Sequence, residues 1–162
     1  RGDGMTMDPI GEGMVVRLRY TMKAIDGRIL DRSDDDGETY LHGAGAIVAG
    51  LERALAGKRA GDEVSVLVRP EEGYGVRQPS PGPQPVPRAT FHEGASLKPG
   101  VSFEAETPDG KPVTLYITRV ETQAVYVDTN HPFAGMSLLY DVEILAVRAA
   151  TAAEKKNQAP KD

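Results

Sequence analysis

Alternating hydrophobic and polar residues predict that most of this chain folds into strands. In residues 14–24 the side chains of one face are Val16, Leu18, Tyr20 and Met22, and those between them are charged or hydroxyl-bearing. This is the pattern of a half-buried strand. Asp-Gly pairs at 26–27 and 109–110 predict hairpin turns. Further alternating segments are found at residues 63–68, 101–107, 111–120, 124–128 and 137–147.

One segment has helical spacing instead. Ile47, Leu51 and Leu55 recur at intervals of four residues, and Gly57 follows as a stop signal. The predicted fold is therefore α+β, an antiparallel sheet wrapped on one short helix. From Pro79 to Pro87 every second residue is proline. Proline lacks an N–H and fixes φ, so we expect an extended connector there.

Composition narrows the classes of function. Of 162 residues, 40% are hydrophobic and 27% charged, a globular balance, and the net charge is −5. Lys and Arg form no stripe, so we expect no nucleic-acid partner. No run approaches the ~20 apolar residues of a membrane span. The first ten residues lack the apolar core of a secretory signal. We expect a disordered polar tail at 151–162.

The glycine-rich segment before the helix raises the question of a phosphate site. Gly43 and Gly45 match the start of a dinucleotide fingerprint, but Val48 replaces its last glycine. Gly45 and Gly50 have P-loop spacing, but Leu-Glu follows where Lys-Ser or Lys-Thr is required. The chain has no cysteine, and its histidines lack metal-ligand spacing. We therefore expect no cofactor and no metal.

Two long segments carry a family resemblance. Residues 40–75, YLHGAGAIVAGLERALAGKRAGDEVSVLVRPEEGYG, and residues 127–147, VDTNHPFAGMSLLYDVEILAV, resemble FKBP-type peptidyl-prolyl isomerases of the SlyD-like branch. The resemblance extends over roughly residues 14–150 and implies a second, mostly-β domain inserted into the isomerase fold, called insert-in-flap. It places the isomerase domain at 1–80 and 128–150 and the chaperone insert at 81–127.

The implied reaction breaks no covalent bond. It is rotation about an X–Pro amide, whose barrier of ~18–20 kcal/mol reflects partial double-bond character. An apolar pocket that excludes water, with donors aimed at the twisted amide, lowers that barrier selectively. The chemistry needs a cup for the proline ring rather than an acid, a base or a nucleophile.

The resemblance assigns the residues of that cup. Tyr74 matches the family tyrosine whose hydroxyl bonds a substrate carbonyl, Asp31 the acidic residue near the twisting amide, and Tyr20 an aromatic wall. The remaining pocket residues are Leu30, Ile47, Val48, Leu51, Phe133, Ala134 and Tyr140. The Val48 N–H matches a donor to a carbonyl beyond the proline. Without the resemblance, the aliphatic residues would be ordinary core, the tyrosines too, and Asp31 a turn residue.

The insert is expected to be a different kind of site. Its alternating strands predict a core of Val101, Phe103, Leu115 and Ile117. In the family the insert captures extended unfolded segments on exposed apolar surface. Our candidates for that surface are Phe91, Leu97, Val125 and Tyr126.

The resulting hypothesis is a cytoplasmic, monomeric prolyl isomerase and folding chaperone that acts on proline-containing peptides and unfolded proteins. Two alternatives stay open at this point. The chain could be a peptide-binding chaperone whose pocket does not catalyse, or a member of a related branch whose insert is a poor chaperone.

Overall fold

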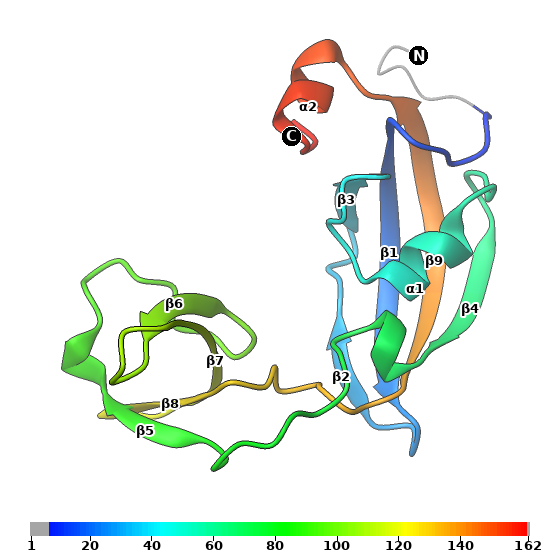
Figure 1. Ribbon diagram of the computed structural model, residues 1–162. Helices are drawn as coiled ribbons and strands as arrows, with labels where there is room; N and C mark the ends of the chain where they lie inside the picture. The colour runs from blue at the N-terminus through cyan, green and yellow to red at the C-terminus, as the bar shows by residue number, and fades with distance from the viewer. Residues whose placement is uncertain (1–6, 162) are drawn as a thin grey trace. The chain divides into compact units, whose positions relative to one another are not determined.

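The computed structural model describes residues 7–161, which form two compact units (Figure 1). Unit 1 contains the residues up to Gly73 and those from Met136 onward, and unit 2 is Tyr74–Gly135. Residues 74–80 and 128–135 thus belong to unit 2, whereas the sequence placed them in the isomerase domain. Residues 1–6, part of the segment expected to hold no secretory signal, lie outside the described residues. So does residue 162, part of the tail expected to be disordered.

Unit 1 is built on one antiparallel sheet with the strand order β2-β1-β9-β4, and β3 pairs with β1. Its strands are β1 (Met14–Ala24), β2 (Ile29–Arg32), β3 (Glu38–Leu41), β4 (Glu63–Val68) and β9 (Leu138–Ala149). β1 and β9 pair along their whole lengths, from Met14 opposite Ala149 to Ala24 opposite Leu138. This central pair explains the strict alternation of the sequence, since one face of each strand is buried.

The predicted helix is α1 (Ala49–Leu55), which lies across the sheet (Figure 1). Its apolar side chains Leu51 and Leu55 are buried against the sheet residues. Gly57 follows with φ +84°, a conformation that favours glycine, which confirms the stop signal. A short 3₁₀ turn, Pro70–Glu72, follows β4. The fold class predicted from the pattern, mostly antiparallel strands with little helix, is confirmed.

The polar end of the chain corrects one prediction. Residues 152–157, expected to be disordered, form helix α2 (Ala152–Asn157). Thr151 and Glu154 make a reciprocal capping box at its start. Arg148 of β9 also donates two hydrogen bonds to the Glu154 carboxylate, at 2.8 and 2.7 Å. These bonds fix the helix to the end of β9, so its polar composition does not leave it unfolded.

Unit 2 holds a second antiparallel sheet with the order β5-β8-β7-β6. Its elements are β5 (Gln84–Pro87), a 3₁₀ turn (Arg88–Thr90), β6 (Ser102–Glu106), β7 (Pro112–Val120) and β8 (Ala124–Asp128). Ile117, Val125 and Val127 are buried at its centre. Half-buried around them are Val86, Phe91, Leu97, Val101, Phe103, Leu115 and Val120. Of the predicted core residues, Ile117 is buried, while Val101, Phe103 and Leu115 are half-buried and pack against the buried centre. Part of the proline segment forms the edge strand β5.

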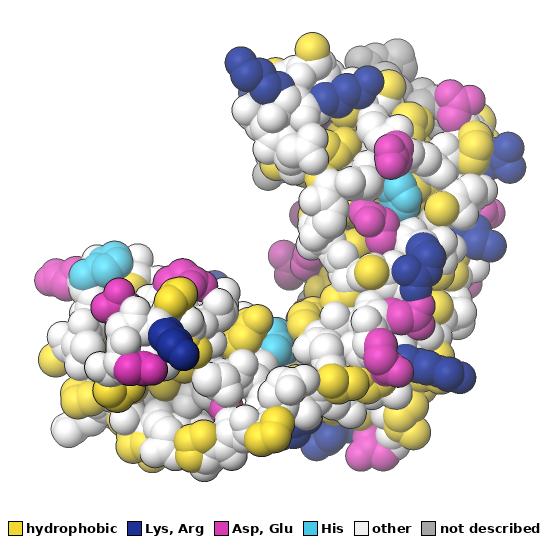
Figure 2. Space-filling view, in the orientation of Figure 1, with side chains coloured by type: hydrophobic (Ala, Val, Ile, Leu, Met, Phe, Trp, Pro, Cys, Tyr) yellow, Lys and Arg dark blue, Asp and Glu magenta, His cyan; other side chains and the backbone are white. Residues whose placement is uncertain are grey.

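Two surface observations bear on partners. No helix within residues 7–161 is long and apolar enough to cross a membrane. On the face drawn in Figure 2, Lys and Arg side chains are scattered among Asp and Glu and gather into no basic stripe.

Candidate active site

Tyr20 and Asp31 meet on adjacent strands of unit 1. Met22 lies opposite Asp31 in the β1–β2 pair, so Tyr20, two residues before Met22, is a diagonal neighbour of Asp31 on the same face. The Tyr20 hydroxyl donates to Asp31 Oδ2 at 2.9 Å, and the Arg32 N–H donates to Asp31 Oδ1 at 2.8 Å. Both carboxylate oxygens therefore accept hydrogen bonds, which holds the exposed Asp31 side chain in one orientation.

Tyr140 joins this pair from the other side of β1. It lies opposite Met22 in the β1–β9 register, so its side chain shares the face of Tyr20. The two tyrosine rings are tilted by 50° with centroids 6.2 Å apart. Tyr140 is buried, while Tyr20 and Leu30 are half-buried. The structure thus brings together Tyr20, Asp31 and Tyr140, three residues predicted for the pocket.

The start of α1 carries the next group of predicted residues. Leu51 is buried, Ile47 and Val48 are half-buried, and Val48 is the N-cap. The Val48 carbonyl accepts hydrogen bonds from the N–H groups of Leu51 and Glu52. Within residues 7–161 no hydrogen bond from the Val48 N–H is present. That donor is available to a bound carbonyl.

The glycine turn before α1 has a structural role. Gly43 and Gly45 have φ of +98° and +72°, which only glycine adopts readily. The Gly43 N–H donates to the Glu52 carboxylate at 2.9 Å. A carboxylate of this chain therefore stands where a phosphate-binding turn would offer its N–H to a ligand.

Tyr74, Phe133 and Ala134 lie together in unit 2. The Tyr74 ring stacks on His131 with centroids 4.1 Å apart and planes 18° apart, and Phe133 meets Tyr74 edge-on at 5.7 Å. Ala134 is buried, and its N–H donates to the His131 carbonyl. His131 is the residue that sequence reasoning missed, because a histidine without metal-ligand spacing is most often structural or exposed. The available signal was its place in the NHPFAG motif beside Phe133.

Comparisons with known proteins agree on one family. The sequence model described as FKBP-type peptidyl-prolyl cis-trans isomerase matches residues 8–145. The FKBP-type peptidyl-prolyl cis-trans isomerase SlyD of Yersinia pestis is 42% identical over 146 residues, 90% of this chain and 74% of that protein. The SlyD protein of Vibrio cholerae is 41% identical over 88% of this chain and 70% of that protein. The SlyD protein of Escherichia coli K12 is 39% identical over 90% of this chain and 74% of that protein. The chain belongs to the FKBP-type peptidyl-prolyl cis-trans isomerase family.

Membership of the FKBP-type family confirms the predicted enzyme class, a peptidyl-prolyl cis-trans isomerase whose substrates contain proline. The non-catalytic alternative is thereby disfavoured. The residues described above are suited to such chemistry. Burial lowers the pKa of His131, and it also lowers the pKa of His42. Both imidazoles are therefore neutral near pH 7, and the reaction requires no proton transfer from them.

The candidate client surface of this FKBP-type isomerase is only partly as expected. Phe91 and Leu97 line an apolar cavity of about 420 Å³ in unit 2, together with Val101, Phe103 and Ile117. Val125 was expected on the surface, and this prediction is wrong because the side chain is fully buried in the sheet core. Tyr126, its neighbour on the opposite face of β8, is half-buried under the Arg119 guanidinium, 3.8 Å from the ring centroid.

Proposed function

We propose that this isomerase is also a folding chaperone, which holds extended unfolded segments on unit 2 and rotates their X–Pro bonds. The observation that carries the proposal is an open strand edge, β6, beside the apolar cavity of unit 2. In this proposal residues 81–127 are the insert-in-flap chaperone domain. The rest of residues 1–150 is the isomerase domain.

The opposite edge of the same sheet is closed to strand addition. The Arg88 N–H donates to the Gln123 carbonyl, which sets the direction of alternate N–H groups along β5. The backbone N–H groups of Gln84 and Val86 therefore point toward β8. The backbone nitrogens of Pro85 and Pro87 point away from the sheet. Proline has no N–H, so the outer edge of β5 offers no donors to another strand.

The β6 edge is built differently. The backbone N–H of Thr107 donates to the Lys111 carbonyl, and the backbone N–H of Ile117 donates to the Val101 carbonyl. In this register the backbone N–H and C=O groups of the odd-numbered residues of β6 point toward β7. The backbone groups of Ser102, Glu104 and Glu106 then point away from the sheet.

An added strand would bond to these outward groups whatever its sequence. Ser102 and Phe103 also line the apolar cavity, so alternate apolar side chains of the bound segment would have a place to pack. Main-chain bonding together with a non-specific apolar pocket is the chemistry that recognises unfolded polypeptide. The same features would serve many different clients.

Catalysis is assigned to the residues that match the family pattern. The apolar side chains Leu30, Ile47, Leu51 and Tyr140 would exclude water from the proline ring, which favours the less polar twisted amide. The Val48 N–H and the Tyr74 hydroxyl would donate to substrate carbonyls, and Tyr20 and Phe133 would supply aromatic walls. Asp31, oriented by Tyr20, would face the twisting amide.

A matched pair of variants tests the chaperone proposal. Glu104→Pro removes an outward N–H without breaking the ladder to β7, and Glu104→Ala keeps that N–H. Both variants lose the side-chain bond from Thr114, so this loss cancels in the comparison. We expect Glu104→Pro alone to lose suppression of aggregation of an unfolded protein, with isomerisation of a short proline peptide unchanged. Equal suppression by both variants would contradict strand addition at β6.

The site assignment is tested separately with the short peptide. Tyr74→Phe removes one hydrogen-bond donor, worth about 1 kcal/mol, and should lower kcat/KM roughly five- to tenfold. Asp31→Ala should also lower it. If both variants isomerise the peptide at the parent rate, the assignment is wrong.

We further propose a cytoplasmic location and a monomeric form. The absence of cysteine from the sequence suits a reducing compartment. Light scattering on the purified chain measures the oligomeric state directly.

A further inference from the structure

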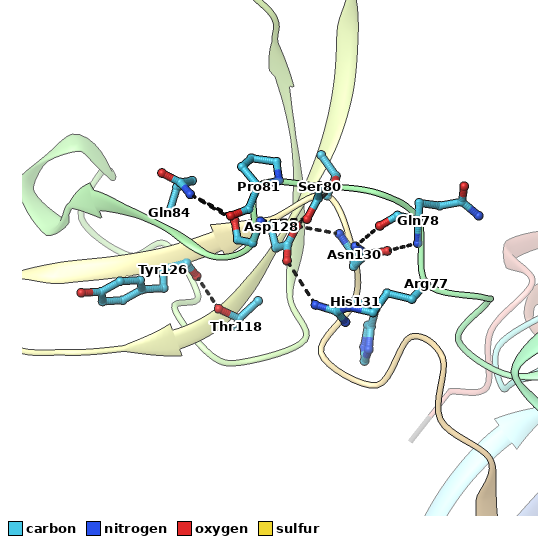
Figure 3. A network of polar contacts seen from close by, with 12 residues as sticks. Arg77, Gln78, Ser80, Pro81, Gln84, Thr118, Tyr126, Asp128, Asn130 and His131 are labelled. Carbon is cyan, nitrogen blue, oxygen red and sulfur yellow. Dashed lines mark hydrogen bonds and ion pairs between the residues drawn. The ribbon is translucent and has the colours of Figure 1, made fainter.

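Two segments of unit 2, residues 74–78 and 128–135, run side by side, and Asn130 of the second segment bonds to the backbone of the first (Figure 3). The Gln78 N–H donates to Asn130 Oδ1 at 2.8 Å, and Asn130 Nδ2 donates to the Gln78 carbonyl at 2.9 Å. A side-chain amide thus pairs with both backbone groups of Gln78, as a neighbouring strand would. The Gly135 N–H closes the far end by donating to Gly75 at 2.8 Å. We call the Gln78–Asn130 pair the connector clamp.

Asp128 fixes the asparagine from the other side. Its side chain is buried, and Oδ1 accepts a hydrogen bond from the Asn130 N–H at 3.3 Å. Oδ2 faces the Arg77 guanidinium at 3.6 Å. Asn130 itself is 4% exposed, so its amide has exchanged water for these partners and is held in a single orientation.

The residue after the clamp carries the ring on which Tyr74 stacks. His131 lies between Tyr74, with centroids 4.1 Å apart, and Tyr116, which meets it edge-on at 5.4 Å. His131 Nδ1 accepts a hydrogen bond from the Phe133 N–H at 2.9 Å. In neutral imidazole the proton is then on Nε2. The imidazole plane, and with it the plane of Tyr74, is fixed by contacts on several sides.

We propose that Asn130 and His131 are positioning residues for Tyr74, the clamp setting the register of the two segments and the imidazole setting the plane of the tyrosine ring. The inference rests on the proposed function, in which the Tyr74 hydroxyl donates to a substrate carbonyl. A donor contributes to catalysis only when it is held in the productive geometry, and a displacement of about 1 Å can cost up to ~100-fold.

The arrangement predicts a dependence on pH. Protonation of His131 places a hydrogen on Nδ1, which then no longer accepts from Phe133. The groups that face the imidazole are the rings of Tyr74, Tyr116 and Phe133. Arg77 and Asp128 pair with each other, and no ion pair within residues 7–161 joins His131 to a carboxylate. Activity should fall as the pH drops through the pKa of His131, which burial places below its ordinary value of 6.5.

A double-mutant cycle on the full chain tests the proposal, with kcat and KM measured on a short proline peptide. His131→Ala should lower kcat roughly tenfold with little change in KM, as expected for an interaction made in the transition state. In a Tyr74→Phe background the same substitution should have almost no further effect, because His131 acts through the tyrosine. Additive losses would overturn the inference.

Conservative variants separate the ring from the hydrogen bond. His131→Phe keeps a stacking ring and should restore most of the activity lost in His131→Ala, without the decline at acid pH. Asn130→Asp keeps the Oδ1 acceptor but lacks the donor to the Gln78 carbonyl, so both Asn130→Asp and Asn130→Ala should lower kcat. Equal activity of His131→Phe and His131→Ala would show that stacking is irrelevant. An acid decline that persists in His131→Phe would show that a group other than His131 causes it.

Controls distinguish this failure from that of the proposed function. Retained suppression of aggregation by each variant shows that unit 2 is folded. If Tyr74→Phe itself leaves the rate unchanged, the role proposed for Tyr74 is wrong, and the inference falls with it. If Tyr74→Phe is impaired while the His131 variants are fully active, the proposed function stands and only the positioning role is wrong.

Discussion

Unit 1 has a large, fully buried hydrophobic centre, whereas unit 2 leaves most of its large hydrophobic side chains half-exposed. The β1–β9 pair places fully buried residues such as Val16, Leu138 and Val147 at the centre of unit 1. In unit 2 only Ile117, Val125 and Val127 form a closed centre, and seven further apolar residues are packed against it while partly exposed. Burying one Leu or Phe contributes roughly 1.5–3 kcal/mol. The apolar area of unit 2 is thus only partly used for stability.

The two units also hold their candidate functional residues by different means. Tyr20 and Tyr140 extend from long strands whose register fixes them. Tyr74 precedes a segment without a strand ladder, so a side-chain clamp and a stacked imidazole take the place of a sheet. The difference indicates that sites in unit 2 depend on individual polar side chains. Sites in unit 1 depend on the sheet as a whole.

The largest expected effect comes from matched Leu→Ala substitutions in the two units. Leu138→Ala removes a fully buried side chain and should lower the free energy of unfolding of unit 1 by about 3 kcal/mol. Leu115→Ala in half-buried β7 should cost about 1 kcal/mol in unit 2. Urea unfolding, followed through amide signals of each unit, measures both. Equal losses would remove the difference in packing on which this comparison rests.

A smaller effect is expected at the closed edge of unit 2. Pro85→Ala with Pro87→Ala gives β5 two outward N–H groups, each able to form a hydrogen bond worth about 1 kcal/mol, or roughly fivefold in association. The variant should self-associate through β5 at concentrations where the parent does not. Sedimentation or light scattering detects this, with Pro79→Ala, outside the strand, as the control. A variant that associates no more than the control would show that proline does not protect this edge.

Part of the molecule could be predicted from the periodicity of the sequence. β1 and β9 are long, and each has a buried face, so alternation located them. In β8 the same alternation rules out one of the predictions. Val125 and Tyr126 are adjacent in a strand and must face opposite sides, so they could not both belong to one exposed surface. The alternation of hydrophobic and polar residues in β7 predicted the core position of Ile117.

Other features depend on partners distant in the sequence. Residues 151–154 have the sequence of a capping box, but α2 is also held by Arg148. The polar composition of this segment predicted disorder instead. Assignment of Tyr74, Asp31 and Tyr20 came from family resemblance, because no periodicity distinguishes a pocket tyrosine from a core tyrosine. The stack of Tyr74 on His131 joins residues on two different segments, so local pattern carried no sign of it.

The smallest and most local effect is expected at α2, because a polar network joins this helix to β9. The paired hydrogen bonds from Arg148 hold the pKa of Glu154 well below its ordinary value of 4.5, with further bonds from the Lys161 and Thr151 N–H groups. A depressed carboxyl pKa means that the unfolded chain binds the proton more readily. The stabilisation is therefore complete above about pH 5.5 and is lost as the pH falls below 4.5.

Hydrogen exchange of the α2 amides should follow this dependence, after correction for the intrinsic effect of pH. In the parent chain protection of residues 154–158 should decrease on acidification, while that of Ile117 and Val125 in unit 2 changes little. Glu154→Gln keeps the capping-box geometry, since glutamine also serves at this position, but removes the charge that Arg148 binds. The variant should show low protection of α2 already at neutral pH, with no further acid dependence. A parent-like acid transition in Glu154→Gln would mean that another carboxylate controls the helix, and that the Arg148 pair is not what joins α2 to β9.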